Sequence, residues 1–326
     1  MLSARAATAT RCLSAFALSA RGFSSTSASL AQSATRRITV VGGGQMGSGI
    51  AQVAATKNHN VTLVDVSQES LDRGKAYMSK SLKRVAKKKF ADDATAQTKF
   101  VDDVLARITL TTNATEAAGN ADLVVEAIVE NIKVKQDLFA SLAKAAPESA
   151  ILASNTSSLP IAKIAELLSA ERKERFIGLH FFNPVPQMKL VEVVRTNETK
   201  QEVVDSAVAF VKAIGKEPAV CKDTPGFIVN RLLLPYMMES IRLLERGVAS
   251  ARDIDTAMKL GAGYPMGPFE LCDYVGLDTI KFIVDGWYKE GQGLQGNKIF
   301  ESNKTLNELV KNGHLGVKTG KGFYEY

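Results

Sequence analysis

Residues 38–65 read ITVVGGGQMGSGIAQVAATKNHNVTLVD, and this stretch decides the fold. A run rich in β-branched residues, Ile38–Val41, leads directly into glycines at positions 42, 44 and 47, and a helical stretch and a second apolar run, Val61–Asp65, follow. A strand, a glycine turn, a helix and a second strand in this order form a βαβ unit. The stretch therefore predicts a parallel sheet with a helix packed on its first two strands.

The glycine spacing and the acid at the end of the second run predict a bound dinucleotide. Gly42, Gly44 and Gly47 form the pattern GxGxxG, which allows a tight turn, a close approach of the backbone to a diphosphate, and close packing of helix on strand. The N–H groups of a helix that begins there favour phosphate. Asp65 can accept hydrogen bonds from both ribose hydroxyls and would repel a 2′-phosphate, so we expect NAD rather than NADP. A helix-packing turn with an incidental aspartate is the structural alternative.

Short β-branched runs alternate with helical stretches as far as Asp223. The expected strands are Ile38–Val41, Val61–Asp65, Ile108–Leu110, Leu123–Ala127, Ile151–Ser154, Phe176–Phe182, Leu190–Arg195 and Pro218–Cys221. This alternation predicts an α/β fold with a Rossmann-type, doubly wound, mostly parallel sheet. Phe182 and Leu190 are too close in sequence for a helical crossover, so an antiparallel hairpin is expected there.

The pattern becomes helical after Asp223, so three parts are expected. Residues 1–34 precede the fold, residues 35–223 form an NAD-binding domain, and residues 224–326 form an all-helical domain for substrate binding and dimerisation. The expected helices of the last part run from Pro225 to about Arg246 with a kink at Pro235 and a cap at Gly247, from a Ser250–Asp253 capping box to Gly261, over Pro268–Tyr288, and over Asn303–Lys311. Its apolar residues, among them Leu232, Leu233, Leu234, Met237 and Ile241, predict a homodimer.

The N-terminal segment has the composition of an import signal. Residues 1–34 contain three arginines among many Ala, Ser and Thr residues, and the first acidic residue of the chain is Asp65. An Arg-rich, Ser-rich and acid-free segment is typical of an organelle transit peptide, and Arg21-Gly22-Phe23-Ser24 resembles a mitochondrial processing site. We therefore expect the mitochondrial matrix as the destination. A chloroplast address and an untargeted tail are the alternatives.

Composition excludes several other classes of protein. No run of about 18 apolar residues is present, which predicts that the chain does not span a membrane. Cys12, Cys221 and Cys272 offer neither a disulfide framework nor zinc-ligand spacing, so no metal site is expected. Without the arginines of residues 1–34 the formal charge of +7 falls to +4, and no nucleic-acid-binding motif accompanies the remaining charge.

One histidine lies in a position suited to catalysis. Removal of a hydride from an alcohol requires a base for the hydroxyl proton, and histidine is the usual base because its pKa is about 6.5. His180 ends an apolar run, whereas His59 and His314 lie in turns and are expected to be exposed. Glu192 shares a strand face with apolar residues, so its buried carboxylate needs a partner. The hairpin predicts that this partner is His180; a purely structural pair in the core is the alternative.

Seven stretches of the chain resemble the short-chain L-3-hydroxyacyl-CoA dehydrogenases of mitochondria. They read VGGGQMGSGIAQ, DLVVEAIVENIKVK, ASNTSSLPI, GLHFFNPVPQMKLVEVV, CKDTPGFIVNR, LGAGYPMGPFELCDYVGLD and GVKTGKGFYEY. The resemblance extends from about Arg37 to the C-terminus. It implies oxidation of an L-3-hydroxyacyl-CoA to the 3-ketoacyl-CoA with NAD⁺, in fatty-acid β-oxidation, with His180 as the base and Glu192 as the group that orients it.

The resemblance also implies which side chains bind the ligands. It implies hydrogen bonds to the substrate from Ser157, Asn183 and Asn230, and coenzyme A contacts at Ser81, Lys88 and Ser157. It implies NAD contacts at Gly42, Gly43, Gly44, Gln45, Met46, Gly47, Asp65, Glu130, Lys135, Ser157, Asn183 and Lys318.

Each of these assignments has a structural alternative. Ser157 or Ser158 could cap a helix that begins near Pro160, and Asn183 could only form a turn before Pro184. Asn230 could face water from the middle of a helix, and Lys318 could be a solvated loop charge. The basic run Lys83, Arg84, Lys87, Lys88 and Lys89 could hold the phosphates of coenzyme A or form a solvated helix face. Two other functions stay open, namely a dehydrogenase of another hydroxy acid and a non-enzymatic NAD-binding protein.

Overall fold

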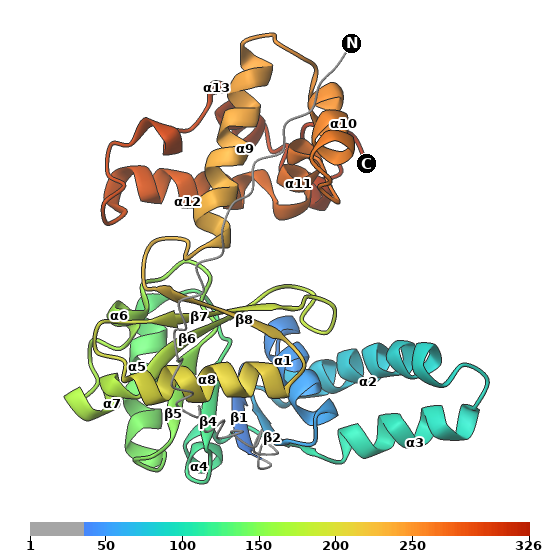
Figure 1. Cartoon of the computed structure of the whole chain (residues 1–326), viewed down its shortest axis with the longest axis vertical. Helices are drawn as coiled ribbons and strands as arrows, with labels where there is room; N and C mark the ends of the chain where they lie inside the picture. Colours follow the sequence, from blue (N-terminus) through green and yellow to red (C-terminus); the bar gives the residue numbers. More distant parts are fainter. Residues whose placement is uncertain (1–35) are drawn as a thin grey trace, which may run out of the picture. The chain divides into compact units, whose positions relative to one another are not determined.

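The computed structural model of the chain describes residues 36–326, and its framework is a single sheet. The predicted transit peptide lies outside the described residues. The strands are β1 (Arg37–Val41), β2 (Asn60–Val64), β3 (Ile108–Thr111), β4 (Leu123–Glu126), β5 (Ile151–Ser154), β6 (Phe176–Phe181), β7 (Leu190–Arg195) and β8 (Glu217–Lys222). Their order is β3-β2-β1-β4-β5-β6-β7-β8 (Figure 1), and β6–β7 is the only antiparallel pair among them. The predicted sheet and hairpin are confirmed, with strand ends shifted by one residue at several places.

Helices cover both faces of this sheet. The side chains of β1 alternate between two cores, since Val40 packs with α1 (Gln45–Thr56), α2 (Gln68–Phe90), α3 (Ala94–Leu105) and α8 (Gln201–Ala213), whereas Val41 packs with α4 (Ala114–Ala118), α5 (Ile132–Ala145) and α6 (Ile161–Ile164). The short α7 (Ala170–Glu174) precedes β6. In a sheet of this kind ligands bind at the carboxyl ends of the strands, where the strand order reverses on either side of β1.

The last hundred residues are helical, as predicted. They form α9 (Val229–Glu245), α10 (Ala251–Gly261), α11 (Pro268–Val275), α12 (Leu277–Glu290) and α13 (Lys304–Lys311) around a separate apolar core. Ser250 caps α10 by accepting the N–H of Asp253, and that helix ends at Gly261 as expected.

Two helix boundaries in this domain differ from the prediction. The first helix begins at Val229 and not at Pro225, because Gly226 and Phe227 have φ angles of 78° and 50°, which a right-handed helix excludes. The expected helix Pro268–Tyr288 is two helices, because Gly276 has a φ of 100°. Left-handed residues interrupt both segments, and the apolar periodicity of the sequence does not reveal them.

The apolar residues expected to face a partner are mostly internal. Leu234, Met237 and Ile241 lie in the core of the helical domain itself, and only Leu232 of the predicted set is widely exposed, at 70%. Apart from Leu232, these residues therefore offer little surface to a partner subunit. None of the helices in residues 36–326 has the length and hydrophobicity needed to cross a membrane.

His59 is buried, so the prediction of an exposed turn residue was wrong. Its side chain is 1% exposed, and its ring packs against Phe210 of α8. Nδ1 accepts a hydrogen bond from the backbone N–H of Arg36 at 3.1 Å. Burial lowers the pKa of His59, and the charge of Arg36 lowers it further. The turn before β2 is thus part of the interior of the domain.

Candidate functional site

The glycine loop lies between β1 and α1, at the carboxyl end of the sheet. Gly42 has a φ of 116°, and a Cβ there would lie 2.4 Å from the carbonyl oxygen of Ala127. A Cβ on Gly47 would lie 1.9 Å from the carbonyl oxygen of Gly42, so both positions require glycine. Gly44 is different, because a Cβ there would meet no atom within 4 Å. The open space at Gly44 fits a position where the backbone must admit a ligand.

Asp65 lies directly after β2, where its carboxylate faces the glycine loop. Oδ2 accepts the N–H of Gly43 at 2.7 Å. Asp65 and Gly44 line two adjoining cavities. One, of about 470 Å³, is apolar and includes Val41, Val64, Val66, Ile128, Val129 and Leu138 in its lining. The other, of about 570 Å³, is lined by Gln45, Ser48, Ser70, Arg73 and Tyr77 among others. An apolar cavity beside a carboxylate suits the adenosine end of NAD.

His180 and Glu192 occupy directly opposite positions in the β6–β7 ladder. Nδ1 of His180 lies 2.7 Å from Oε2 of Glu192, whose side chain is fully buried. The His180 ring packs between Phe182 and Phe227, with centroid distances of 4.4 and 5.7 Å. A carboxylate at this distance fixes the proton on Nδ1. Nε2 makes no hydrogen bond to residues 36–326, so a proton acceptor is left free for a ligand.

Glu192 has a second set of partners at the start of the helical domain. Its Oε1 accepts the N–H groups of Ile228 at 3.0 Å and Val229 at 2.8 Å, where α9 begins. Unpaired N–H groups and the positive dipole end of a helix stabilise a carboxylate. Both oxygens of the Glu192 carboxylate therefore have partners: Oε2 contacts the imidazole, and Oε1 accepts the N–H groups at the start of the helix.

A buried ion pair lies beneath the loop after β5. The ammonium group of Lys135 is 2.5 Å from Oε1 of Glu126 and 3.1 Å from Oε2 of Glu130, and its side chain is 1% exposed. Glu126 also accepts the hydroxyl of Ser154 at 2.6 Å. Burial alone raises the pKa of Glu130, but the charge of Lys135 and a hydrogen bond from Thr156 bring it below its usual value. Two of the predicted NAD contacts, Glu130 and Lys135, thus bond to each other.

Glu130 holds the loop that carries Ser157. Its Oε1 accepts the N–H groups of Ser157 at 3.1 Å and Ser158 at 3.3 Å. The amide of Asn230 lies 3.5 Å from the carbonyl oxygen of Ser157, so α9 also reaches this loop. The alternative in which a serine caps the following helix is wrong, because the carboxylate of Asp223 accepts the first N–H groups of α6, at Ile161 and Ala162.

A groove lies between α2 and the loop that joins β6 to β7. This cavity of about 730 Å³ brings together Ser81, Arg84, Lys87 and Lys88 of α2 with Pro184, Pro186 and Gln187 of the loop. It shares Gln45 and Tyr77 with the cavity beside Asp65. Figure 1 shows α2 and α3 side by side, and Lys89 lies over the rings of Phe90 and Phe100 on that side. The basic run is therefore divided, with only part of it lining the groove.

Asn183 and Lys318 lie apart from these bonded groups. Asn183 is exposed on the β6–β7 loop, directly before Pro184 of the groove wall. Lys318 bonds with both carboxylate oxygens of Asp278, at 2.6 and 2.7 Å, within the helical domain. No hydrogen bond joins either side chain to another predicted site residue in the described part of the chain.

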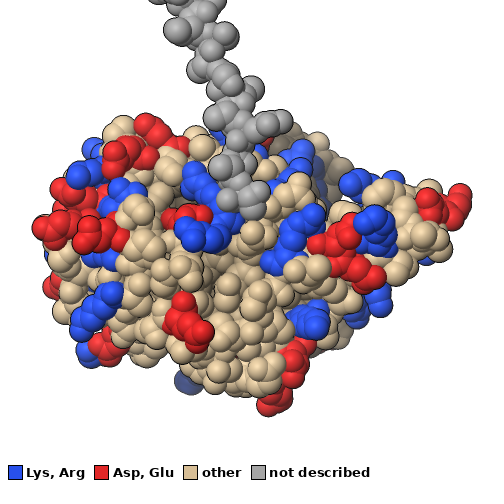
Figure 2. Space-filling model, turned by 90° about the horizontal axis from the view of Figure 1, so that it is seen from below, with Lys and Arg blue, Asp and Glu red and all other residues tan. Residues whose placement is uncertain are grey.

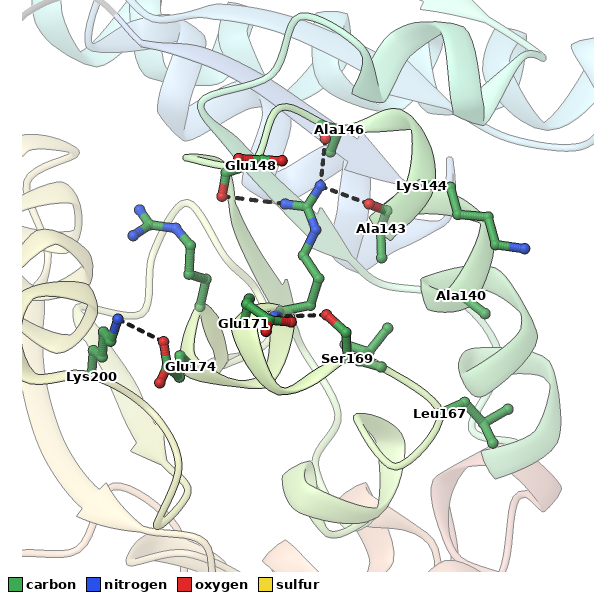
Figure 3. A pocket seen from close by; sticks show the side chains of 13 residues that line it. Ala140, Ala143, Lys144, Ala146, Glu148, Leu167, Ser169, Glu171, Glu174 and Lys200 are labelled. Atoms are coloured by element: carbon green, nitrogen blue, oxygen red, sulfur yellow. Dashed lines mark hydrogen bonds and ion pairs between the residues drawn. The ribbon is translucent and has the colours of Figure 1, made fainter.

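Another cavity lies at the amino ends of the strands (Figure 3). It has a volume of about 850 Å³, and its lining residues Ala146, Glu148 and Glu174 come shortly before β5 and β6, at their amino ends. Three of its cations are already bonded, since Lys200 pairs with Glu174 at 2.6 Å, Arg172 donates to four backbone carbonyl groups, and Arg175 bonds to Glu202. We therefore attribute to this cavity no part in the chemistry.

Sequence reasoning missed several residues of the site. Glu126 ends a buried apolar strand, and its carboxylate gave the same signal as that of Glu192. Thr156, Asp223 and Phe227 gave no such signal, because their importance depends on bonds to distant segments and on a left-handed φ.

On the face seen in Figure 2, Lys and Arg side chains are interspersed with Asp and Glu, so the positive charge does not gather in one stripe there.

Comparisons with known proteins agree with this fold. Residues 37–224 match the family model described as the NAD binding domain of 3-hydroxyacyl-CoA dehydrogenase, and residues 226–326 match that of its C-terminal domain. Mitochondrial hydroxyacyl-coenzyme A dehydrogenase of Homo sapiens is 56% identical over 95% of this chain and 98% of its own. The relative from Sus scrofa is 55% identical over 93% and 95%. The crystal structure of (S)-3-hydroxybutyryl-CoA dehydrogenase from Ralstonia eutropha has a TM-score of 0.82 at 38% identity, covering 90% of this chain and 99% of that one.

Proposed function

The chain belongs to the 3-hydroxyacyl-CoA dehydrogenase family, and we propose that His180 and Glu192 carry out its reaction. It is an NAD-dependent oxidoreductase of hydroxyacyl-CoA, in agreement with the names of its mitochondrial relatives. The observation that supports the catalytic assignment most strongly is the 2.7 Å contact between His180 Nδ1 and a fully buried carboxylate, with Nε2 left free. This arrangement suits a general base.

The proposed reaction begins with the hydroxyl proton of the substrate. His180 Nε2 accepts this proton while the proton on Nδ1 stays between the ring and Glu192. Bound NAD⁺ would supply the acceptor for the hydride that leaves the carbon bearing this hydroxyl group. The imidazolium that forms is stabilised by the negative charge of Glu192, which the N–H groups of Ile228 and Val229 keep in place. A base of this kind contributes on the order of 10²- to 10⁴-fold in rate.

The proposed cofactor site follows the glycine loop. Gly42, Gly43, Gly44, Gln45, Met46 and Gly47 surround the diphosphate position, and Asp65 binds the adenosine ribose. Glu130 and Lys135 position the Ser157 loop at the nicotinamide end through the bonds described above. Ser157 and Asn183 complete that end. A contact from Lys318 requires its ammonium group to turn away from Asp278.

The proposed site for coenzyme A is the groove on α2. Ser81 and Lys88 share this groove, with Arg84 and Lys87 beside them, and phosphates favour such a cationic lining. Because the groove adjoins the cavity beside Asp65, both ligands can be held at once. We propose that the acyl end of the substrate contacts Ser157 and Asn230. These two residues lie close together, since the Asn230 amide nitrogen is 3.5 Å from the carbonyl oxygen of Ser157.

We also propose a homodimer, formed through the helical domain. Large apolar side chains are exposed there, among them Leu260 at 84%, Phe282 at 79% and Leu232 at 70%. These side chains supply apolar surface that the proposed interface would cover. A stable, active monomer in analytical ultracentrifugation would contradict this assembly. We propose that the chain divides into residues 1–34, 35–223 and 224–326. We also propose that it is imported into the mitochondrial matrix and that residues 1–34 are removed there.

A substrate series tests the proposed function. Purified enzyme should oxidise L-3-hydroxyacyl-CoAs of several chain lengths with NAD⁺ and should oxidise the corresponding free hydroxy acids far more slowly. If a free hydroxy acid reacted faster than its coenzyme A thioester, the groove would have been assigned to the wrong ligand. If NAD⁺ bound without any turnover, the protein would be a binding protein and not a dehydrogenase.

A further inference from the structure

Lys216 is a buried cation that the proposed reaction does not use. It lies between α8 and β8, and 6% of its surface is exposed. Among residues 36–326 it forms no ion pair with a carboxylate. A buried ammonium group is unfavourable unless hydrogen bonds replace its water. The reason for its burial must therefore lie in the groups it contacts.

Those groups are two backbone carbonyls of the loop between β6 and β7. The ammonium group of Lys216 donates to the carbonyl oxygen of Val185 at 2.6 Å and to that of Met188 at 2.5 Å. The adjacent Glu217 donates its N–H to the carbonyl oxygen of Lys189 at 2.8 Å, which ties the end of the same loop. Lys216 thus holds the loop from beneath at two points.

The loop is also packed tightly against α1. A Cβ on Gly49 of α1 would lie 2.8 Å from Cβ of Val185, so the helix and the loop are packed as closely as glycine permits. The N–H groups of Gln187 and Met188 both donate to the carbonyl oxygen of Pro184, which makes the loop a compact turn. Its path is set by α1 on one side and by Lys216 on another.

This loop forms one wall of the groove and carries a predicted site residue. Pro184, Pro186 and Gln187 face Ser81 and Lys88 across the groove, and Asn183 is the residue before Pro184. A shift of the loop would change the width of the groove and the place of Asn183 together. The position of Lys216 thus bears on substrate binding although it lines none of the cavities around the site.

We propose that Lys216 is a positioning residue for the acyl-CoA substrate, which it serves by fixing the groove wall through the carbonyls of Val185 and Met188. The inference rests on the proposed function, because it takes the groove as the coenzyme A site. Lys216 touches neither ligand. Its removal should therefore weaken the binding of the coenzyme A thioester, and it should affect NADH affinity far less, through Asn183 alone, because the glycine loop and Asp65 lie on other elements.

The test compares Lys216→Met with Lys212→Met, which removes an exposed lysine from α8. Methionine matches the length of lysine but donates no hydrogen bond. Activity is measured with acetoacetyl-CoA and with the same acyl group on N-acetylcysteamine, which lacks the nucleotide, and NADH binding is measured by fluorescence titration. Hydrogen exchange reports on the loop itself.

We expect Lys216→Met to raise the KM for acetoacetyl-CoA by about 10-fold, as the loss of bonds from a charged donor predicts. The KM for the short thioester should rise less, NADH affinity should change less than the KM for acetoacetyl-CoA, and exchange should accelerate at Gln187 and Met188. Lys212→Met should behave as the wild type. If Lys216→Met does not fold, Lys216→Gln replaces it, because glutamine keeps an N–H donor. Its KM for acetoacetyl-CoA should lie between the wild-type value and a 10-fold increase.

Two results would overturn the inference, and they can be told apart. If the wild type prefers acetoacetyl-CoA but neither Lys216 variant changes its KM, the groove is correct and the role of Lys216 is not. If the wild type itself has the same KM for both thioesters, the coenzyme A groove is wrong, and the inference falls with it.

Discussion

His180 and Glu192 face each other across the β6–β7 ladder, and the oxygen of Glu192 that does not contact His180 receives the first N–H groups of α9. One buried carboxylate thus joins the proposed base to the helical domain. Phe227 reinforces this junction, because its ring packs on His180 while its φ of 50° directs the next two N–H groups toward Glu192. Left-handed conformation at a non-glycine residue is unfavourable and persists where surrounding contacts maintain it.

Replacement of the proposed base should separate binding from catalysis. We expect His180→Gln to bind NADH as the wild type does, since His180 does not line either cavity at the glycine loop. Its turnover should fall on the order of 10²- to 10⁴-fold, because no group remains to take the hydroxyl proton. Steady-state kinetics and NADH titration measure the two effects. His314→Gln is the matched control, and near-normal turnover of His180→Gln would refute the assignment.

Glu192→Gln tests whether the carboxylate sets the state of His180. The glutamine carbonyl can still accept the N–H groups of Ile228 and Val229, so the fold should persist. Its amide N–H would face Nδ1 and move the ring proton to Nε2, where it blocks proton uptake. We expect turnover to fall by roughly 10²-fold or more with thermal unfolding near that of the wild type. A surface substitution, Glu202→Gln, controls for charge, and a variant that kept most of its activity would argue for a structural pair.

Asp65→Ala tests the preference for NAD. The substitution removes the carboxylate that would repel a 2′-phosphate and leaves the N–H of Gly43 free. The ratio of kcat/KM for NAD⁺ to that for NADP⁺ should fall by about 10-fold or more, since each 1.4 kcal/mol corresponds to a factor of ten. Asp72→Ala, on the exposed face of α2, is the matched control. An unchanged cofactor ratio in Asp65→Ala would remove its proposed role.

The features that sequence predicted are those that depend on local spacing. The GxGxxG pattern lies within one short stretch of sequence, and the pairing of His180 with Glu192 follows from strand alternation and a short connection. The late start of α9 depends on Gly226 and Phe227, whose φ angles no periodicity reveals.

Long-range burial explains what sequence missed in the site. The sequence around Lys216 is typical of a charged turn. The ammonium group of Lys216 nevertheless donates to the carbonyl oxygens of Val185 and Met188, about 30 residues earlier in the chain. This contact is possible because parallel β7 and β8 lie side by side. Glu126 and Lys135 were separated by a turn in the sequence but form one buried pair. Such contacts are set by the tertiary packing of strands and helices, which spacing within one segment does not specify.

His59 should make the stability of the fold sensitive to acid. Burial, aided by the charge of Arg36, lowers the pKa of His59 in the folded state, whereas the unfolded chain has the ordinary value of about 6.5. The unfolded state therefore binds more protons below this pH, so the free energy of unfolding decreases as pH falls through that range. His59→Gln retains an oxygen that can accept the N–H of Arg36 but does not titrate. We expect urea unfolding at pH 7 and pH 5 to show a smaller loss of stability for this variant than for the wild type, and equal losses would show that His59 is not the group responsible.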